Sequence, residues 1–260
     1  MSQGINYLNT WKCHVLISTV IIVLACPGIA GAAPLIPIPN INVGVEQANT
    51  PQDVALSLQV LLMLTVLSLA PSILVMMTSF TRIIIVLSFL RSALATQNVP
   101  PNQVIVGLSL FLTFYTMSPY FEQVNQNALQ PMLAGTMDQQ TAMTEAVKPM
   151  REFMFKQTRE NDLALFVNMS EMPRPNGSED VPTSVLIPSF IISELKTAFQ
   201  IGFLIYIPFI VIDMVVASTL MSMGMMMLPP VMISLPFKIL LFILVDGWHL
   251  IIRSLVSSFI

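Results

Sequence analysis

Six charged side chains lie in apolar segments of the last third of this chain, and their types could do chemistry. Three are acids and three are bases: Glu194, Asp213, Asp246, Lys196, Lys238 and Arg253. A charge in a membrane-type helix is costly, so it usually faces a partner or a water-filled path. The equal numbers leave two interpretations open. The charges form ion pairs that fix helix register, or they form a relay for protons or a substrate.

Asp213 and Lys238 are well placed to pair, because they lie at nearly equal distances from a predicted turn at Met225–Pro229. A helical hairpin brings them to the same level, whereas we expect Glu194 to pair across subunits. Three carboxylates do not make an acid–base site without a pocket and a surrounding polar layer. The sequence shows no catalytic triad, metal-ligand spacing or cofactor motif. We therefore predict that the protein is not an enzyme and holds no metal or cofactor.

The segment Asp213–Pro230, read DMVVASTLMSMGMMMLPP, predicts irregular backbone between two apolar helices. Its consecutive methionines are Met225, Met226 and Met227, and the residues that break the helix around them are Gly224, Pro229 and Pro230. Glycine weakens a helix by about 1 kcal/mol relative to alanine, and proline ends one. Irregular backbone in an apolar context must be buried in protein or line a water-filled cavity. The flexible thioethers suit a deformable collar around a conduit or a softly packed hairpin tip.

The composition is that of a membrane protein, with 55% hydrophobic residues, 10% charged residues and a mean hydropathy of +0.77. Soluble domains carry about 25% charged residues. More than half of the charge lies in Glu122–Pro182. The 11 lysines and arginines form no basic run, which argues against nucleic-acid binding.

The first 32 residues resemble a cleavable signal peptide. Lys12 precedes the apolar core Val15–Ala25, and the small residues Ala30, Gly31 and Ala32 offer a cleavage site. The apolar core is shorter than the roughly 20 residues that span a bilayer. A retained anchor or a lipoprotein box before Cys26 are the alternatives. Both cysteines lie in this segment, so cleavage would leave a chain without disulfides or cysteine metal sites. Residues 33–52 then form a flexible leader.

The apolar runs predict an all-α membrane protein with long, kinked helical hairpins that oligomerise into a pore complex. The runs are Val54–Thr78, Ile83–Leu94, Val104–Met117, Ser184–Ser222 and Val231–Ile260. Residues 53–121 form the first hairpin, and residues 184–260 form the second hairpin with the methionine tip and a C-terminal helix. Pro71 should kink the first run, and the third run is short for a bilayer. Arg82 and Arg91 place the turn between them on the cytoplasmic side.

Residues 122–183 form a hydrophilic helical insert, which lies outside the cytoplasm if the N-terminus is exported. We expect its main helix at Thr141–Asn168, opened or kinked by Pro149. The apolar face of this helix comprises Val147, Met150, Phe153 and Met154. Glu152, Lys156 and Glu160 are spaced for two i,i+4 pairs.

Three segments, in order, closely resemble the FliP family of flagellar type III export-gate proteins, whose virulence-system counterparts (SctR) share the pattern. They are PSFIISELKTAFQIGF (188–203), DMVVASTLMSMGMMMLPP (213–230) and SLPFKILLFILVDGW (234–248). The insert's KPMREFMFKQTRENDLALF (148–166) is similar to the family's extracytoplasmic segment. The resemblance covers roughly residues 54–259. The cleavable leader and long insert favour the flagellar branch over the virulence branch.

The resemblance implies a core subunit of the gate through which unfolded flagellar proteins are secreted. It implies a pentamer that assembles with FliQ and one FliR, with FlhA and FlhB completing the export apparatus. It places the complex in the bacterial inner membrane at the flagellar basal body, with apolar hairpins largely above the bilayer on the periplasmic side. The family's pore gasket falls on Met225, Met226 and Met227, and its charged positions between subunits fall on Glu194 and Lys238.

Two functions of other classes remain as alternatives. A small solute or ion transporter would use Glu194, Asp213 and Lys238 as a relay, and it would be expected to show internal symmetry between halves. A structural scaffold would only hold the other export proteins in place.

Overall fold

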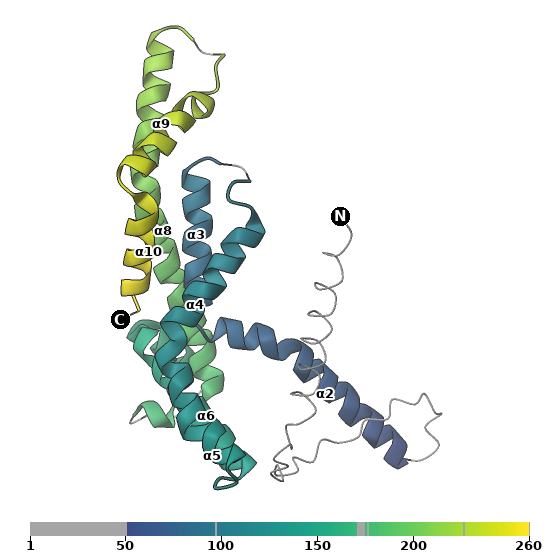
Figure 1. Ribbon diagram of the computed structural model, residues 1–260. Coiled ribbons are helices and arrows are strands. Elements are labelled where there is room, and N and C mark those ends of the chain that lie inside the picture. The colour runs from purple at the N-terminus through teal and green to yellow at the C-terminus, as the bar shows by residue number, and fades with distance from the viewer. Residues whose placement is uncertain (1–50, 97, 171–174, 176, 226, 260) are drawn as a thin grey trace, which may run out of the picture. The chain divides into compact units, whose positions relative to one another are not determined.

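The structure is a computed structural model that describes residues 51–259 except 97, 171–174, 176 and 226. The predicted signal peptide and almost the whole leader lie outside the described residues. Every regular element within them is helical (Figure 1), which confirms the all-α fold class for this part of the chain. Two helices are long and apolar enough to cross a membrane, Asn102–Leu133 and Thr183–Ser222, and a bent helix pair near the C-terminus would make a third.

The first helices are α2 (Pro51–Met76), α3 (Phe80–Ala93) and α4 (Asn102–Val124). The helix that contains the third apolar run extends beyond Met117, the last residue of that run. The helix continues through a π-helical segment (Asn125–Leu129) and α5 (Gln130–Leu133). Its polar residues do not stop it, because Gln126 donates to Glu122 one turn earlier, at 2.6 Å, on the exposed surface.

Where the sequence predicted one main helix in the insert, at residues 141–168, the structure has two, α6 (Gln139–Gln157) and α7 (Glu160–Met169). A short 3-10 helix (Ser178–Asp180) follows. Thr158 and Arg159 are extended between α6 and α7, so Lys156 and Glu160 do not share a helix. Pro149 lies inside α6, which begins ten residues earlier behind the N-cap Asp138. Of the predicted apolar face, Met150, Phe153 and Met154 are buried, and Val147 is exposed.

The second hairpin begins with α8 (Thr183–Ser222), a helix of 40 residues that contains Pro188 and Pro208. It returns as α9 (Pro230–Leu244) and α10 (Gly247–Ser257). The predicted single run after Val231 is therefore two helices, bent by 65°. The bend lies at Asp246, whose φ of 51° is left-handed.

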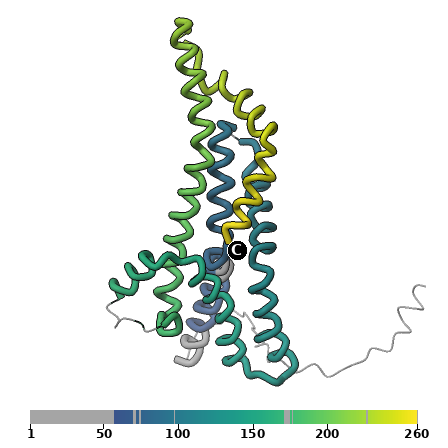
Figure 2. The backbone as a smooth tube through the Cα atoms, turned by 90° about the vertical axis from the view of Figure 1, so that its left-hand side faces the viewer, coloured from purple at the N-terminus to yellow at the C-terminus, as the bar shows by residue number. Residues whose placement is uncertain are grey.

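The core forms where α3 packs between α4 and α8, with α6 closing one end (Figures 1 and 2). Ile83, Val86 and Leu90 of α3 are buried there, together with Phe153 and Phe190. Helices α3 and α8 approach closely at Gly202, where an added Cβ would lie 2.6 Å from the Phe89 ring. The two helices therefore form a tight pair, and the end of α8 that carries the methionines extends toward the turn.

Candidate functional site

The methionine turn between α8 and α9 is shaped by glycine and proline. Gly224 has φ of 74°, which is a left-handed conformation that glycine adopts readily. The Met225 amide donates to the Leu220 carbonyl at 3.0 Å, and the Gly224 amide donates to the Met221 carbonyl at 3.0 Å, so two of the last carbonyls of α8 are satisfied. Pro229 precedes α9 and Pro230 is its first residue. The backbone of the turn is thus set by residue type at both ends.

The side chains of this turn are exposed in the chain by itself. Met227 is 99% exposed, and Met225 is half-buried. Met226 lies outside the described residues. Other exposed methionines on the adjoining helix ends are Met214, Met221, Met223 and Met232. Met227 is therefore not packed in the core of its own chain, and the tip exposes soft, apolar thioethers.

Asp213 and Lys238 form the ion pair that their spacing predicts. Lys238 Nζ donates to Asp213 Oδ2 at 2.6 Å, and Ser234 Oγ donates to Oδ1 at 2.5 Å. Lys238 is nearly fully buried and also approaches the Ala93 carbonyl, at 3.4 Å. Ala93 is the last residue of α3, and the helix dipole favours a cation at this end of a helix. Lys238 therefore connects α9 to both α8 and α3.

Glu194 pairs within its own chain, with a residue that sequence reasoning did not assign to it. Arg82 of α3 donates through Nε to Glu194 Oε2 at 2.9 Å and through Nη2 to Oε1. Its Nη2 also donates to Gln157 Oε1 at 3.0 Å. The carboxylate of Glu194 is fully buried. The available signal was Arg82 itself, because an arginine inside an apolar helix needs an anion nearby.

Lys196 lies two residues after Glu194 on α8 and binds the insert. It donates to Asp162 Oδ1, and Ser193 Oγ donates to Asp162 Oδ2 at 2.9 Å. Arg159 adds a hydrogen bond from its backbone amide to Ser193 Oγ, at 3.0 Å. The ammonium of Lys196 beside Asp162 lowers the pKa of that carboxyl below its ordinary value. These contacts explain why the insert breaks at Arg159, since the break docks α7 against α8.

The two remaining predicted charges are Asp246, exposed at the bend before α10, and Arg253, exposed on α10. Neither joins any of the four ion pairs found among the described residues. Glu194 and Asp213 are 19 residues apart on α8, about 28 Å along the axis. Within this chain, Glu194 and Asp213 therefore belong to two separated ion pairs, Arg82–Glu194 and Asp213–Lys238, which we call the two anchors.

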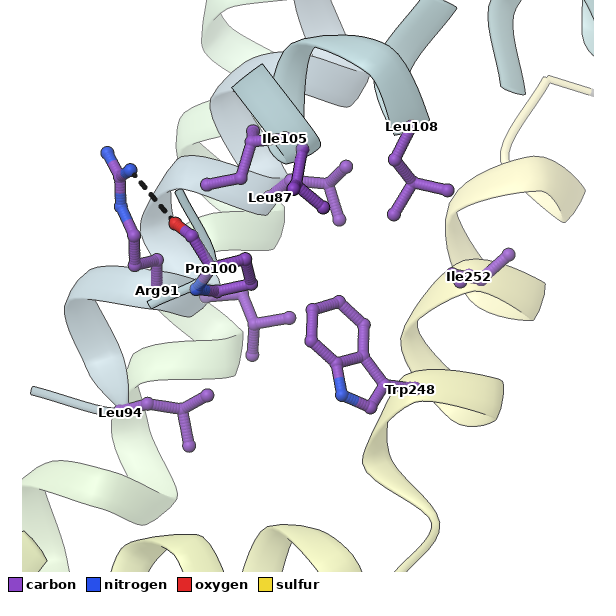
Figure 3. A pocket seen from close by; sticks show the side chains of 10 residues that line it. Leu87, Arg91, Leu94, Pro100, Ile105, Leu108, Trp248 and Ile252 are labelled. Carbon is purple, nitrogen blue, oxygen red and sulfur yellow. Dashed lines mark hydrogen bonds between the residues drawn. The ribbon is translucent and has the colours of Figure 1, made fainter. Parts of the chain in front are cut away.

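A cavity of about 300 Å³ lies between α3, the loop before α4, and α10 (Figure 3). Leucine and isoleucine side chains dominate its wall, and Trp248 closes it from α10. Arg91 turns toward the Pro100 carbonyl, at 3.5 Å. The described residues also contain no group of three or more His, Cys, Asp or Glu that could hold a metal. The cavity offers apolar packing space without convergent acid–base groups.

Comparison with known proteins gives a consistent result. Residues 63–255 match the FliP family. The flagellar biosynthetic protein FliP of Bacillus subtilis (strain 168) is 58% identical over 220 residues, which are 85% of this chain and 100% of the relative. The FliP protein of Pectobacterium carotovorum is 56% identical over 81% of this chain and 82% of the relative. That of Treponema pallidum is 51% identical over 90% of this chain and 87% of the relative.

Proposed function

Because this chain belongs to the FliP family and is a membrane component of the flagellar type III export gate, we propose that its methionine turn closes the conduit for unfolded flagellar proteins. The observation that carries the proposal is the turn itself. Met227 is 99% exposed on a backbone that Gly224 and Pro229 hold away from the core. An export-gate component of this kind acts by shape and contact, so no catalytic group is needed.

A single turn covers only one side of a channel, so the proposal requires several copies around an axis. The flanking helices carry exposed apolar side chains that need a cover of protein or lipid. These include Phe203, Leu204, Val211, Phe237 and Leu244. We propose a pentamer of this chain, with FliQ and one FliR in the same complex and with FlhA and FlhB beside it. The insert, residues 122–183, would lie on the extracytoplasmic side.

Methionine suits a seal that must open for polypeptides of any sequence. Its unbranched side chain has three rotatable bonds and a polarizable sulfur, so it fills irregular gaps without one fixed shape. A ring of such side chains can close on itself and then adapt to a passing chain. Alanine at the same positions keeps the backbone but leaves an open space in the ring.

The test is the triple replacement of Met225, Met226 and Met227 by alanine in cells that assemble the gate. We expect increased entry of small ions or a membrane-impermeant dye, while the protein still accumulates in the membrane. The matched control replaces Met143 and Met169, which are exposed on the insert, by alanine. Membrane permeability equal to that of the parent in the triple variant would contradict the seal, and a leak of the same size in the control would show that it is not specific to the turn.

A further inference from the structure

The last described residues of the chain occupy a polar socket, which we define as Arg82, Gln157 and Glu194. Arg82 Nη1 donates to both the carbonyl and the hydroxyl of Ser258, each at 3.0 Å. Gln157 Nε2 donates to the Phe259 carbonyl at 3.1 Å. Helix α10 runs beside α3 and α4 toward this end of the fold (Figure 2). The socket therefore joins the C-terminus to three helices that come much earlier in the sequence.

The aromatic ring of Phe259 completes the enclosure of Arg82. The guanidinium carbon lies 4.0 Å from the ring centroid, a cation–π distance. The ring also stacks near Phe153, with centroids 6.3 Å apart. The planar guanidinium thus has a carboxylate at its edge and a ring against its face, which lysine cannot reproduce. Phe259 itself is buried.

This docking matters for the C-terminal arm, by which we mean α9 and α10. Most of the large apolar side chains of α9 are exposed, whereas Ile251 and Leu255 of α10 are buried, so burial alone holds α9 weakly. Lys238 ties α9 to Asp213 and to the end of α3. The socket holds the other end of the arm through Ser258 and Phe259. The arm also carries one side of the methionine turn, so its position sets the position of the tip.

We propose that Ser258 and Phe259 act as a latch that seats the C-terminal arm against the body of the protein, with Arg82 as the positioning residue. Each socket residue precedes Ser258 by at least 64 residues, so the latch joins distant parts of the chain. A chain without its final residues leaves the buried Arg82–Glu194 pair open on the side that Phe259 covers. The arm then stays attached at Lys238 and through the buried Ile251 and Leu255 of α10, and α10 leaves its seated position more often.

The experiment measures the position of the arm relative to the body of the protein. It uses distances between pairs of spin labels in the full-length chain in liposomes, with Cys13 and Cys26 replaced by serine. The arm pair is Tyr115→Cys with Leu250→Cys, and the body pair is Tyr115→Cys with Phe199→Cys. All three label positions are exposed. Each pair is combined with deletion of residues 258–260, with Phe259→Ala, or with Arg82→Lys. The control substitution is Phe111→Ala, which removes an exposed ring from α4.

We expect the ratio of displaced to seated arm to rise about tenfold for Phe259→Ala, since a desolvated cation–π contact contributes roughly that factor. Deletion of residues 258–260 should raise this ratio further, and Arg82→Lys should also raise it. The conservative variant Phe259→Tyr, which keeps an aromatic ring, should show the parental distribution of distances. The body pair and the Phe111→Ala control should not change. An unchanged arm distance after deletion would overturn the latch. Equal disturbance of the arm and body pairs would also overturn it, because the residues would then only support folding in general.

Discussion

Replacement of Lys238 by methionine tests whether the Asp213–Lys238 ion pair holds the second hairpin against α3. The change keeps a long, flexible side chain in a site that is nearly fully buried, and it removes the ammonium. Asp213 then loses its 2.6 Å partner and keeps only the hydroxyl of Ser234. The side chain of Asp213 is 29% exposed, so water reaches part of the uncompensated charge.

The expected loss follows from these contacts. Removal of one partner of a buried ion pair costs about 3–5 kcal/mol, and the partial exposure of Asp213 places this case near about 3 kcal/mol. For a chain of this size, each kcal/mol lowers the melting temperature by about 2–4 °C. We therefore expect a fall of about 6–12 °C. The double variant Lys238→Met/Asp213→Leu should recover most of it, because an apolar pair of similar volume often replaces a buried ion pair without loss.

The assay is thermal unfolding of the purified chain in detergent, followed by far-ultraviolet circular dichroism. The control is Lys148→Met, which breaks an exposed pair with Glu145 and should cost less than about 1 kcal/mol. A melting temperature of Lys238→Met within about 2 °C of the parent would refute the reasoning. So would a double variant that is as unstable as the single one, since the loss would then come from the lysine stem and not from its charge.

Two further predictions concern the turn and the insert. Gly224→Ala should cost about 1–2 kcal/mol, because the φ of 74° at this position is left-handed, and each kcal/mol lowers the melting temperature by about 2–4 °C. The control is Gly107→Ala, inside α4 with no atom within 4 Å of the new Cβ, which should leave the melting temperature equal or higher. Because the pKa of Asp162 is lowered in the folded protein, its ionised carboxylate stabilises the fold at pH values above the ordinary pKa of 3.8. This contribution is lost as pH falls through the folded pKa. Asp162→Asn should therefore be less stable than the parent at neutral pH and equally stable in strong acid, as measured by denaturant unfolding across pH; a constant difference down to the lowest pH would exclude this role for the carboxylate.

Local residue types were enough to predict most helix boundaries near glycine and proline. Gly224 follows the end of α8, and Pro230 begins α9. These signals act through the backbone of one or two residues, so they do not depend on the rest of the fold. The end of α4 was not predictable in this way, because Glu122 and Gln126 bond to each other on an exposed face and let the helix continue.

The charged site was only half predictable, for a reason of sequence distance. Asp213 and Lys238 are 25 residues apart across one turn, so helix geometry alone brings them together. Arg82 and Glu194 are 112 residues apart, and their contact requires knowing that α3 packs on α8. No period or motif in a single sequence carries that information. The same limit applies to Ser258, which is 176 residues from the arginine that binds it.

The placement of these anchors has a physical explanation. In a chain that is 55% hydrophobic, one apolar helix face packs on another with little preference for register, since leucine against leucine resembles leucine against lipid. A buried charge tolerates few neighbours, so each pair selects one alignment at the cost of desolvation. The two anchors bind α3 at its two ends, at Arg82 and at the Ala93 carbonyl. We infer that rigidity is concentrated along α3 so that the thioether turn beyond it can remain deformable.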